Sequence, residues 1–482
     1  WVPRRHRLTG NDPAAHWCCH LFFSQFDRLG PAPGARRNAG RHSVALVRVG
    51  PVRIAISALA PFRPPGWGSV GCRTFSELNL SGALDARHHQ GDAVSVAGAV
   101  CQLNGTVFRH TLAQMSKPAP NQLDAAGEAA LERALRRAWH PVCRADELTE
   151  KPKAVRLCGE ALVVVRLGGQ VAAYPDLCIH RGTALSLGWV DQGTAPAPDG
   201  SPATGEPCLV CPYHGWTYDQ RGAVRRIPAV HGRAIPRRAK IERYATAEHA
   251  GLIWVLMDPG PGGWEDPAPL YPLPAVPWWG DPKLRTIPIK TYDWKSSPAR
   301  RIENFIDFSH FPWVHEGILG DRAKPLSPDH VVESDGETIR FQIALEEPQT
   351  SVKGDAAPGT KVQRDPTTYT VHLPYSVTLD QQLPEGNRFI LFIAASPLSA
   401  KETRTFTWNA RSYRMEPEAD DELAKFQELI LDQDQPITES QRPEQLPIDL
   451  SEELHIAGPD QASIEYRRVL GRIAAEELAR SD

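Results

Sequence analysis

The sequence predicts an α+β protein in which a β-rich domain is followed by a domain of helices packed beside an antiparallel sheet. Three observations carry this prediction. Short apolar runs bounded by turn residues occupy residues 137–262. A stretch rich in Pro and Gly at residues 258–282 marks a boundary near residue 262. Alternating patterns and amphipathic helices then share residues 263–482.

The first domain is preceded by a predicted helix. Residues 123–139 are rich in Ala, Leu, Glu and Arg, the strong helix formers, and we assign residues 115–136 to a leading helix segment. Gly168 and Gly169 separate two β-patterned runs and predict a hairpin turn. The strands expected in this domain are residues 161–167, 170–174 and 251–257.

The second domain alternates between the two secondary-structure periods. A strand is expected at residues 284–292 and a helical stretch at residues 301–315. Amphipathic helices are expected at residues 420–432 and 462–479. The further expected strands are residues 338–345, 368–373, 376–383, 388–394 and 404–413.

Composition excludes several classes of protein. With 23% charged and 41% apolar residues, the chain of 482 residues is typical of a globular protein of two or three domains. No apolar run reaches the roughly 18 residues of a membrane span. Nine cysteines are too few for a disulfide scaffold in a chain of this length. The expected location is the cytoplasm.

Residues 1–114 differ from the remainder in charge. They contain 13 Arg, no Lys and five acidic residues, a net charge of +8, and the first Met is Met115. We expect residues 1–114 to be a spurious or disordered N-terminal extension. A basic arm that binds nucleic acid is the alternative, but the segment lacks a dense Lys/Arg cluster. Residues 191–207 contain no large apolar side chain and predict a mobile surface insertion.

Two loops on either side of that insertion carry metal ligands. Cys178 and His180 are followed, after 30 intervening residues, by Cys211 and His214. Zinc fingers group their cysteines and their histidines separately, whereas here each loop supplies one of each. This division suits a Rieske-type [2Fe-2S] cluster, in which two cysteines bind one iron and two histidines bind the other. Structural zinc remains the alternative.

The residues beside these ligands support the same prediction. Gly182 and Gly215 follow the two histidines and permit tight loops. Tyr213 is expected to supply a hydroxyl to the cluster. Cys208 lies outside the pattern and is expected to be a core thiol.

A second ligand set lies downstream. His310 and His315 are five residues apart on the helical stretch that Pro312 perturbs, so both can face one metal. A carboxylate would complete an open ferrous site of the kind that binds O₂. Asp434 is the preferred carboxylate, with Asp432 and Glu439 as rivals. The alternative is that both histidines belong to the core or to the surface.

The motifs together resemble one enzyme family. CIHRG, CPYHGWTYD, ENFIDFSHFPWVH and DQDQPITESQRP are similar to the motifs of Rieske non-haem iron oxygenase α-subunits. The group nearest in character contains vanillate O-demethylase, methylxanthine N-demethylase and pheophorbide a oxygenase-like proteins. The resemblance implies a Rieske domain at residues 137–262 and a helix-grip-like mononuclear iron domain at residues 263–482. It carries cluster-ligand and iron-ligand roles onto Cys178, His180, Cys211, His214, His310, His315 and Asp434.

The resemblance also implies a trimer. In this family a carboxylate at the position of Asp307 bridges to a cluster histidine of a neighbouring subunit in a homotrimer. A helix-surface acid is the alternative for Asp307. Asn304 is expected either near the iron or in packing. The gap between His180 and Cys211 is longer than is usual in the family, and the insertion at residues 191–207 accounts for the excess.

The expected activity is hydroxylation of an aromatic or heteroaromatic substrate with O₂, as an O- or N-demethylating monooxygenase. The chain shows no dinucleotide-binding fingerprint. Electrons are therefore expected from NAD(P)H through a separate ferredoxin or flavin reductase. A cis-dihydroxylating dioxygenase shares the ligands and is the alternative within the family. A Rieske electron carrier without catalytic iron is the alternative of another class. Residues 368–395 are expected to supply pocket walls.

Overall fold

The computed structural model describes residues 125–196, 200, 202–230, 233–344 and 366–481, together with six short strands. Residues 1–93 and 94–482 form separate compact units, and all that follows concerns the second. The six strands are β1 (Val44–Val49), β2 (Val52–Ser57), β3 (Cys101–Leu103), β4 (Thr106–Phe108), β18 (Glu346–Pro348) and β19 (Lys361–Gln363). The predicted N-terminal extension, residues 1–114, lies outside the described residues apart from β1 to β4.

The first half of the second unit is built from three small antiparallel sheets preceded by α2 (Ala125–Leu135). The predicted hairpin is confirmed, because Gly168 and Gly169 adopt φ of 59° and 84° between β7 and β8. The strands are β5 (His140–Arg144), β6 (Lys153–Leu157), β7 (Glu160–Leu167), β8 (Gln170–Pro175), β9 (Trp189–Asp191), β10 (Cys208–Val210), β11 (Thr217–Tyr218), β12 (Val224–Arg226), β13 (Ala245–His249) and β14 (Leu252–Leu256).

Both cysteine-histidine loops are connected to the sheet with the order β12-β11-β10-β9. One loop follows β8, and the other joins β10 to β11. Both ligand cysteines lie in a buried apolar cluster with Val163, Leu185 and Tyr218. The insertion expected at residues 191–207 separates β9 from β10, and residues 197–199 and 201 lie outside the described residues.

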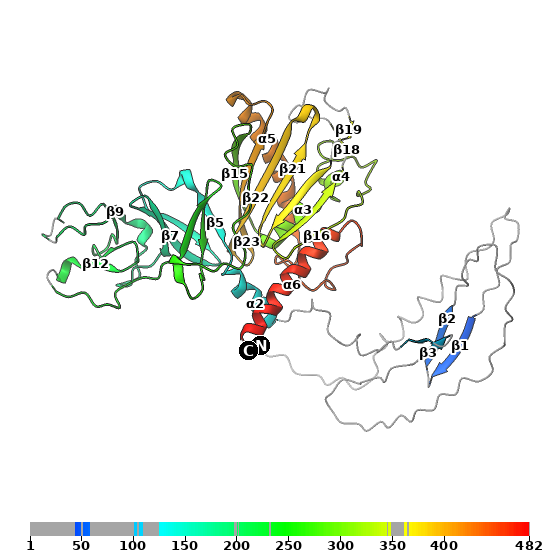
Figure 1. Cartoon of the computed structure of the whole chain (residues 1–482), viewed down its shortest axis with the longest axis horizontal. Coiled ribbons are helices and arrows are strands. Elements are labelled where there is room, and N and C mark those ends of the chain that lie inside the picture. The colour runs from blue at the N-terminus through cyan, green and yellow to red at the C-terminus, as the bar shows by residue number, and fades with distance from the viewer. Residues whose placement is uncertain are drawn as a thin grey trace, which may run out of the picture. The chain divides into compact units, whose positions relative to one another are not determined.

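The second half is a seven-stranded antiparallel sheet with the order β15-β23-β22-β21-β20-β17-β16 and helices α3, α5 and α6 beside it (Figure 1). The α+β prediction is confirmed. The helices are α3 (Pro298–Ile306), α4 (Phe311–Val314), α5 (Asp420–Ser440) and α6 (Gln461–Ser481). The strands are β15 (Arg285–Trp294), β16 (Glu333–Ser334), β17 (Thr338–Ile343), β20 (Thr367–His372), β21 (Ser376–Gln382), β22 (Arg388–Ser399) and β23 (Glu402–Arg411).

The expected helical stretch at residues 301–315 is interrupted. α3 ends at Ile306, and the carboxylate of Asp307 accepts a hydrogen bond from the amide of Ser309 at 2.8 Å, which replaces the helical pattern. A new helix begins at Phe311, where Pro312 occupies a first-turn position that needs no amide hydrogen. Pro312 therefore starts α4 instead of perturbing a longer helix.

The helix expected to end at Asp432 is longer than predicted. α5 continues through Pro436 to Ser440, so Asp434 lies inside the helix. None of the helices in the described ranges is long and apolar enough to cross a membrane.

Candidate functional site

The two cysteine-histidine loops have the same backbone geometry. Each loop contains a glycine just after its histidine, Gly182 in the first loop and Gly215 in the second. Each glycine adopts a φ near 70°, and its amide donates a hydrogen bond to the carbonyl of the cysteine in the same loop. Gly182 bonds Cys178 at 2.8 Å, and Gly215 bonds Cys211 at 3.1 Å. Such a conformation is open to glycine without steric cost. Both loops therefore present a cysteine and a histidine from a short, closed turn.

The loops bring the four predicted ligands together. The rings of His180 and His214 lie 4.6 Å apart between centroids, and His180 stacks on Trp216 at 4.7 Å. Cys178 and Cys211 are almost fully buried. Burial raises the pKa of the Cys211 thiol, and the neighbouring Cys178 thiol raises it further. A cationic metal is what would stabilise both as thiolates.

The tyrosine expected to supply a hydroxyl to the cluster was assigned wrongly. Tyr213 is 62% exposed and lies against the ring of His214. The hydroxyl of Tyr218 instead lies 3.0 Å from Sγ of Cys178. Tyr218 is buried because it lies in β11, directly after the ligand loop. The strand signal in the motif HGWTYD could have identified it.

These residues fit a [2Fe-2S] cluster of the Rieske type. Nδ1 of His180 is buried and has no hydrogen-bond partner among the described residues, as a metal-binding nitrogen would. Cys208 is a buried free thiol whose Sγ contacts the carbonyl of Glu206 at 3.4 Å, in agreement with its prediction as a core residue.

The second set of predicted ligands also converges. Oδ1 of Asp434 lies 3.3 Å from Nε2 of His310 and 3.0 Å from Nε2 of His315, and the two Nε2 atoms are 3.3 Å apart. All three ligand atoms could hold one metal ion. Two imidazoles and one carboxylate form the set that suits non-haem ferrous iron with open positions.

The two rival carboxylates lie elsewhere. Asp432 is exposed on a different face of α5. Glu439 accepts hydrogen bonds from the backbone amide of Lys295 at 3.0 Å and from Gln435 at 2.8 Å. Geometry thus favours Asp434 among the three.

Hydrogen bonds orient both imidazoles. Nδ1 of His315 lies 2.8 Å from the amide oxygen Oε1 of Gln433, which can only accept, so Nδ1 carries the proton. Nδ1 of His310 lies 3.4 Å from Oδ2 of Asp307. Both Nε2 atoms are then free to bind a metal. The sequence reasoning did not identify Gln433, whose only signal is its position beside Asp434.

The charges of this site attract a cation. Burial alone would lower the pKa of His310, but the hydrogen bonds that its ring donates to the carboxylates of Asp307 and Asp434 outweigh burial and raise the pKa to about 9. Burial would raise the pKa of Asp434, but the two histidines hold it well below its usual range. A bound divalent ion would replace the shared proton between these groups.

A cavity lies on one side of the ligands. Its walls are mainly aromatic and aliphatic, and its polar side chains are neutral apart from the ligands. The prediction that residues 368–395 supply walls is correct for Tyr369, Leu379, Gln381, Phe389 and Leu391. The helices add residues that were not predicted: Phe305, Ile430, Leu431 and Gln427.

Asn304 lines this cavity and a second one behind His310. Its Oδ1 accepts a hydrogen bond of 2.9 Å from Nη1 of Arg301, which leaves its amide donor free. Arg301 is fully buried, and its guanidinium lies 4.5 Å from the ring of Trp294. Burial lowers the pKa of Arg301 to about 10, although Asp434 opposes this shift. Asn304 is therefore near the metal ligands, as one of its two expected placements required.

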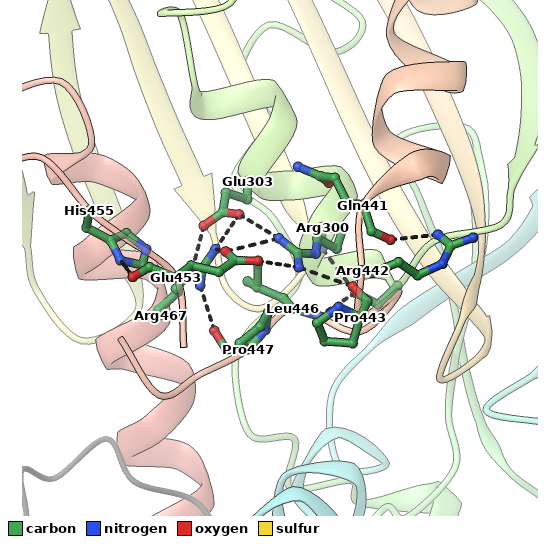
Figure 2. A network of polar contacts seen from close by, with 11 residues as sticks. Arg300, Glu303, Gln441, Arg442, Pro443, Leu446, Pro447, Glu453, His455 and Arg467 are labelled. Carbon is green, nitrogen blue, oxygen red and sulfur yellow. Dashed lines mark hydrogen bonds and ion pairs between the residues drawn. The ribbon is translucent and has the colours of Figure 1, made fainter. Parts of the chain in front are cut away.

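An ion-pair network joins α3 to α6 (Figure 2). Arg467 of α6 binds both carboxylate oxygens of Glu303, at 2.6 and 2.8 Å. Arg300 binds Glu453 at 2.6 Å, and Arg467 contacts the same carboxylate. Two successive turns of α3 are thus joined to α6, and this holds the helix that leads into Asp307 and His310.

Known protein families match both halves of the second unit. The Rieske [2Fe-2S] domain family matches residues 138–244, which include all four cluster-type ligands. The vanillate O-demethylase oxygenase C-terminal domain family matches residues 294–476, which include His310, His315 and Asp434.

Curated relatives extend these matches over most of the second unit. Methylxanthine N1-demethylase NdmA of Pseudomonas putida is 32% identical over 346 residues, 70% of this chain and 88% of the relative. Methylxanthine N3-demethylase NdmB of the same organism is 34% identical over 345 residues, 69% of this chain and 88% of the relative.

Solved structures agree. NdmA of P. putida CBB5, determined as a mutant with theobromine, superimposes with a TM-score of 0.59 at 30% identity, over 72% of this chain and 96% of that protein. Dicamba monooxygenase bound to dicamba is 20% identical with a TM-score of 0.56, over 72% of this chain and 99% of that protein, which shows a shared fold.

Proposed function

Because the chain belongs to the Rieske non-haem iron oxygenases, we propose that it hydroxylates a methyl group on a neutral, flat heteroaromatic molecule. The hydroxymethyl product then collapses to formaldehyde and the demethylated compound. Relatives named as N-demethylases of methylxanthines support this reaction, and so does the chemistry of the cavity.

The charge of the cavity is the observation that carries this proposal. Aromatic and aliphatic walls, including Phe305, Tyr369 and Phe389, suit a flat ring. Within the described residues, no Lys or Arg lines the cavity, so a substrate carboxylate would be buried without a cationic side chain. The carboxamides of Gln381 and Gln427 can donate and accept hydrogen bonds, as ring carbonyls and ring nitrogens require.

The chain's own residues divide the remaining work. Cys178, His180, Cys211 and His214 would hold the [2Fe-2S] cluster, and His310, His315 and Asp434 would hold the ferrous ion. When bound, these groups supply electron transfer and O₂ activation. Asn304 positions an amide donor beside the ligands, and the apolar walls exclude water from the reacting methyl group.

We extend the proposal to a cytoplasmic homotrimer that takes electrons from a separate reductase. Asp307 contacts His310 and remains about one-third exposed, so it can also reach a histidine of another subunit. Large apolar side chains around the cluster loops suit a permanent contact between subunits. They are Leu177, Ile179, Leu187, Trp189 and Tyr213.

Formaldehyde release tests the proposal. Protein reconstituted with iron and sulfide and reduced with dithionite would be mixed with O₂ and a panel of N-methylated purinediones, N-methylated pyrimidinediones and methoxybenzoates. We expect formaldehyde from the neutral N-methyl compounds. Release from methoxybenzoates alone would contradict the neutral-substrate proposal, and a ring diol carrying both atoms of ¹⁸O₂ would indicate the dioxygenase.

A further inference from the structure

One surface segment carries a charge opposite in sign to the net charge of residues 115–482. Residues 221–240, here called the basic segment, contain six Arg, one Lys and no acidic residue. Residues 115–482 as a whole carry a net charge of −11. The basic segment therefore stands out against a negative background, and long-range electrostatics will distinguish it from the rest of the surface.

Four cations of the basic segment are both exposed and unpaired. Arg233, Arg237, Arg238 and Lys240 are exposed, and none of them forms an ion pair within the described ranges. Elsewhere in the segment, Arg225 lies 3.7 Å from Glu206. Four cations without an ion pair within eight residues concentrate positive charge on this part of the surface.

The basic segment lies against a ligand loop. β12, which opens the segment, pairs with β11 directly after the loop of Cys211 and His214. Pro228 packs so closely on Gly215 that a Cβ there would lie 3.0 Å from Cγ of Pro228. Ile227 and Ile235 pack against the buried cluster that contains both ligand cysteines. The positive charges are thus attached to the structure that would surround the [2Fe-2S] cluster.

The cluster loops consequently have two surfaces of different chemistry. The exposed apolar side chains of the ligand loops and β9, such as Ile179 and Trp189, suit a permanent interface between copies of the chain. Isolated charges without apolar anchors suit a weak, fast and electrostatically steered encounter. An electron donor must bind and leave in each cycle, so it matches the charged surface.

We propose that the basic segment is the docking surface for an acidic protein that donates one electron at a time. In each encounter the reduced iron-sulfur or flavin centre of the donor would lose one electron to the [2Fe-2S] cluster that Cys178, His180, Cys211 and His214 would hold. This inference rests on the proposed function only in assuming that the cluster is reduced by a separate protein.

Charge reversal tests the docking surface. The variant Arg237→Glu/Arg238→Glu changes four units of charge within the segment. Lys283→Glu/Lys290→Glu is the matched control, because both lysines are exposed outside the segment and the overall charge changes equally. The probe is a purified, acidic plant-type [2Fe-2S] ferredoxin. Calorimetry at several salt concentrations would measure its affinity, and anaerobic stopped-flow absorbance would measure reduction of the holoprotein cluster.

We expect Arg237→Glu/Arg238→Glu to weaken ferredoxin binding about tenfold or more at low salt and to reduce the salt dependence. The second-order rate of cluster reduction should fall similarly, whereas reduction by dithionite should not change. The control should stay within about twofold of the unaltered protein. Equal losses in both variants would overturn the proposal, because only overall charge would then matter.

Two further outcomes separate the hypotheses. If the charge reversal leaves ferredoxin binding unchanged but dissociates the protein in sedimentation experiments, the segment contacts another copy of the chain, and the docking proposal fails. If ferredoxin binding falls as expected while no N-methyl compound yields formaldehyde, the docking proposal stands and the proposed substrate class fails.

Discussion

The two candidate metal sites of this protein are held in opposite ways. The cluster-type ligands come from two short loops whose shape is set by their own backbone, as the amides of Gly182 and Gly215 show. The iron-type ligands come from the α3–α4 region and from α5, which are distant in sequence and come into contact only when the chain folds. Local substitutions should therefore damage the first site, and remote substitutions can damage the second.

Removal of the Asp434 carboxylate, which contacts both His310 and His315, should have the largest effect on activity. Asp434→Ala is expected to abolish product formation and to lower bound iron from about three to about two per chain, with the visible spectrum of the cluster intact. Iron analysis and absorbance measure this. Asp432→Ala, two residues away on an exposed face, is the control and should retain full iron. Equal iron in both variants would disprove the role of Asp434.

Substitution of Asp307, the residue expected to link the two metal sites, should have the second-largest effect. Asp307→Asn keeps the size of the side chain but removes the charge that faces His310. We expect both metals to remain bound and the transfer of an electron from the cluster to the iron site to slow about a hundredfold or more. Single-turnover stopped-flow kinetics measures this rate. A normal rate would show that Asp307 does not lie on the path between sites.

A second-layer substitution should have a smaller effect. Gln433→Leu removes the acceptor that orients His315. Outer hydrogen bonds of this kind commonly change metal affinity about 10- to 100-fold. Competition with a ferrous chelator would measure the loss. Gln435→Leu, whose side chain instead contacts Glu439, is the control on the same helix.

Acid should weaken both halves of the second unit through buried histidines. Burial lowers the pKa of His140 in β5 and of His372 in β20 to about 4, from the ordinary 6.5. The folded state binds fewer protons than the unfolded chain, so their stabilisation is complete above pH 6.5 and is lost as pH falls toward 4. Each contributes up to about 3 kcal/mol.

Urea unfolding between pH 7.5 and 4.5 would measure this loss of stability. His140→Gln and His372→Gln should each make the unfolding midpoint less sensitive to acid. An unchanged pH profile in both variants would show that these histidines do not control acid stability.

The smallest predicted effect tests the loop geometry. Gly215→Ala should lower the free energy of unfolding by about 1–3 kcal/mol, because it strains a positive φ and places a methyl group against Pro228. Gly169→Ala also strains a positive φ but meets no atom within 4 Å. The difference between the two thermal midpoints isolates the close contact at the ligand loop.

The contrast between the sites explains what the sequence could reveal. Cys178, His180, Cys211 and His214 were identifiable because loop ligands keep their spacing whatever the rest of the fold does. His310 and His315 were identifiable because they are close in sequence and stand at the two ends of one short helix, α4. Asp434 was one of three candidates, because its placement depends on α5 continuing beyond the expected end at Asp432.

Residues that act through tertiary contacts were not identified. Arg301 is buried against Trp294 of a different element, and no local pattern marks it. Gln427 lines the cavity beside the iron-type ligands from α5, and its sequence context is that of an ordinary amphipathic helix. Tyr218 was not considered, because Tyr213 stands between the ligands in the sequence, and proximity in sequence does not show which tyrosine is buried.

The ion-pair network around Arg467 has a practical consequence for protein engineering. A C-terminal deletion that removed Arg467 would leave Glu303 and Glu453 without their shared guanidinium, although the deleted residues lie far along the chain from the iron ligands. Loss of one partner from a buried pair commonly costs about 3–5 kcal/mol. Trimmed versions made for crystallisation should therefore retain α6 at least through Arg467, even though the helix supplies no ligand.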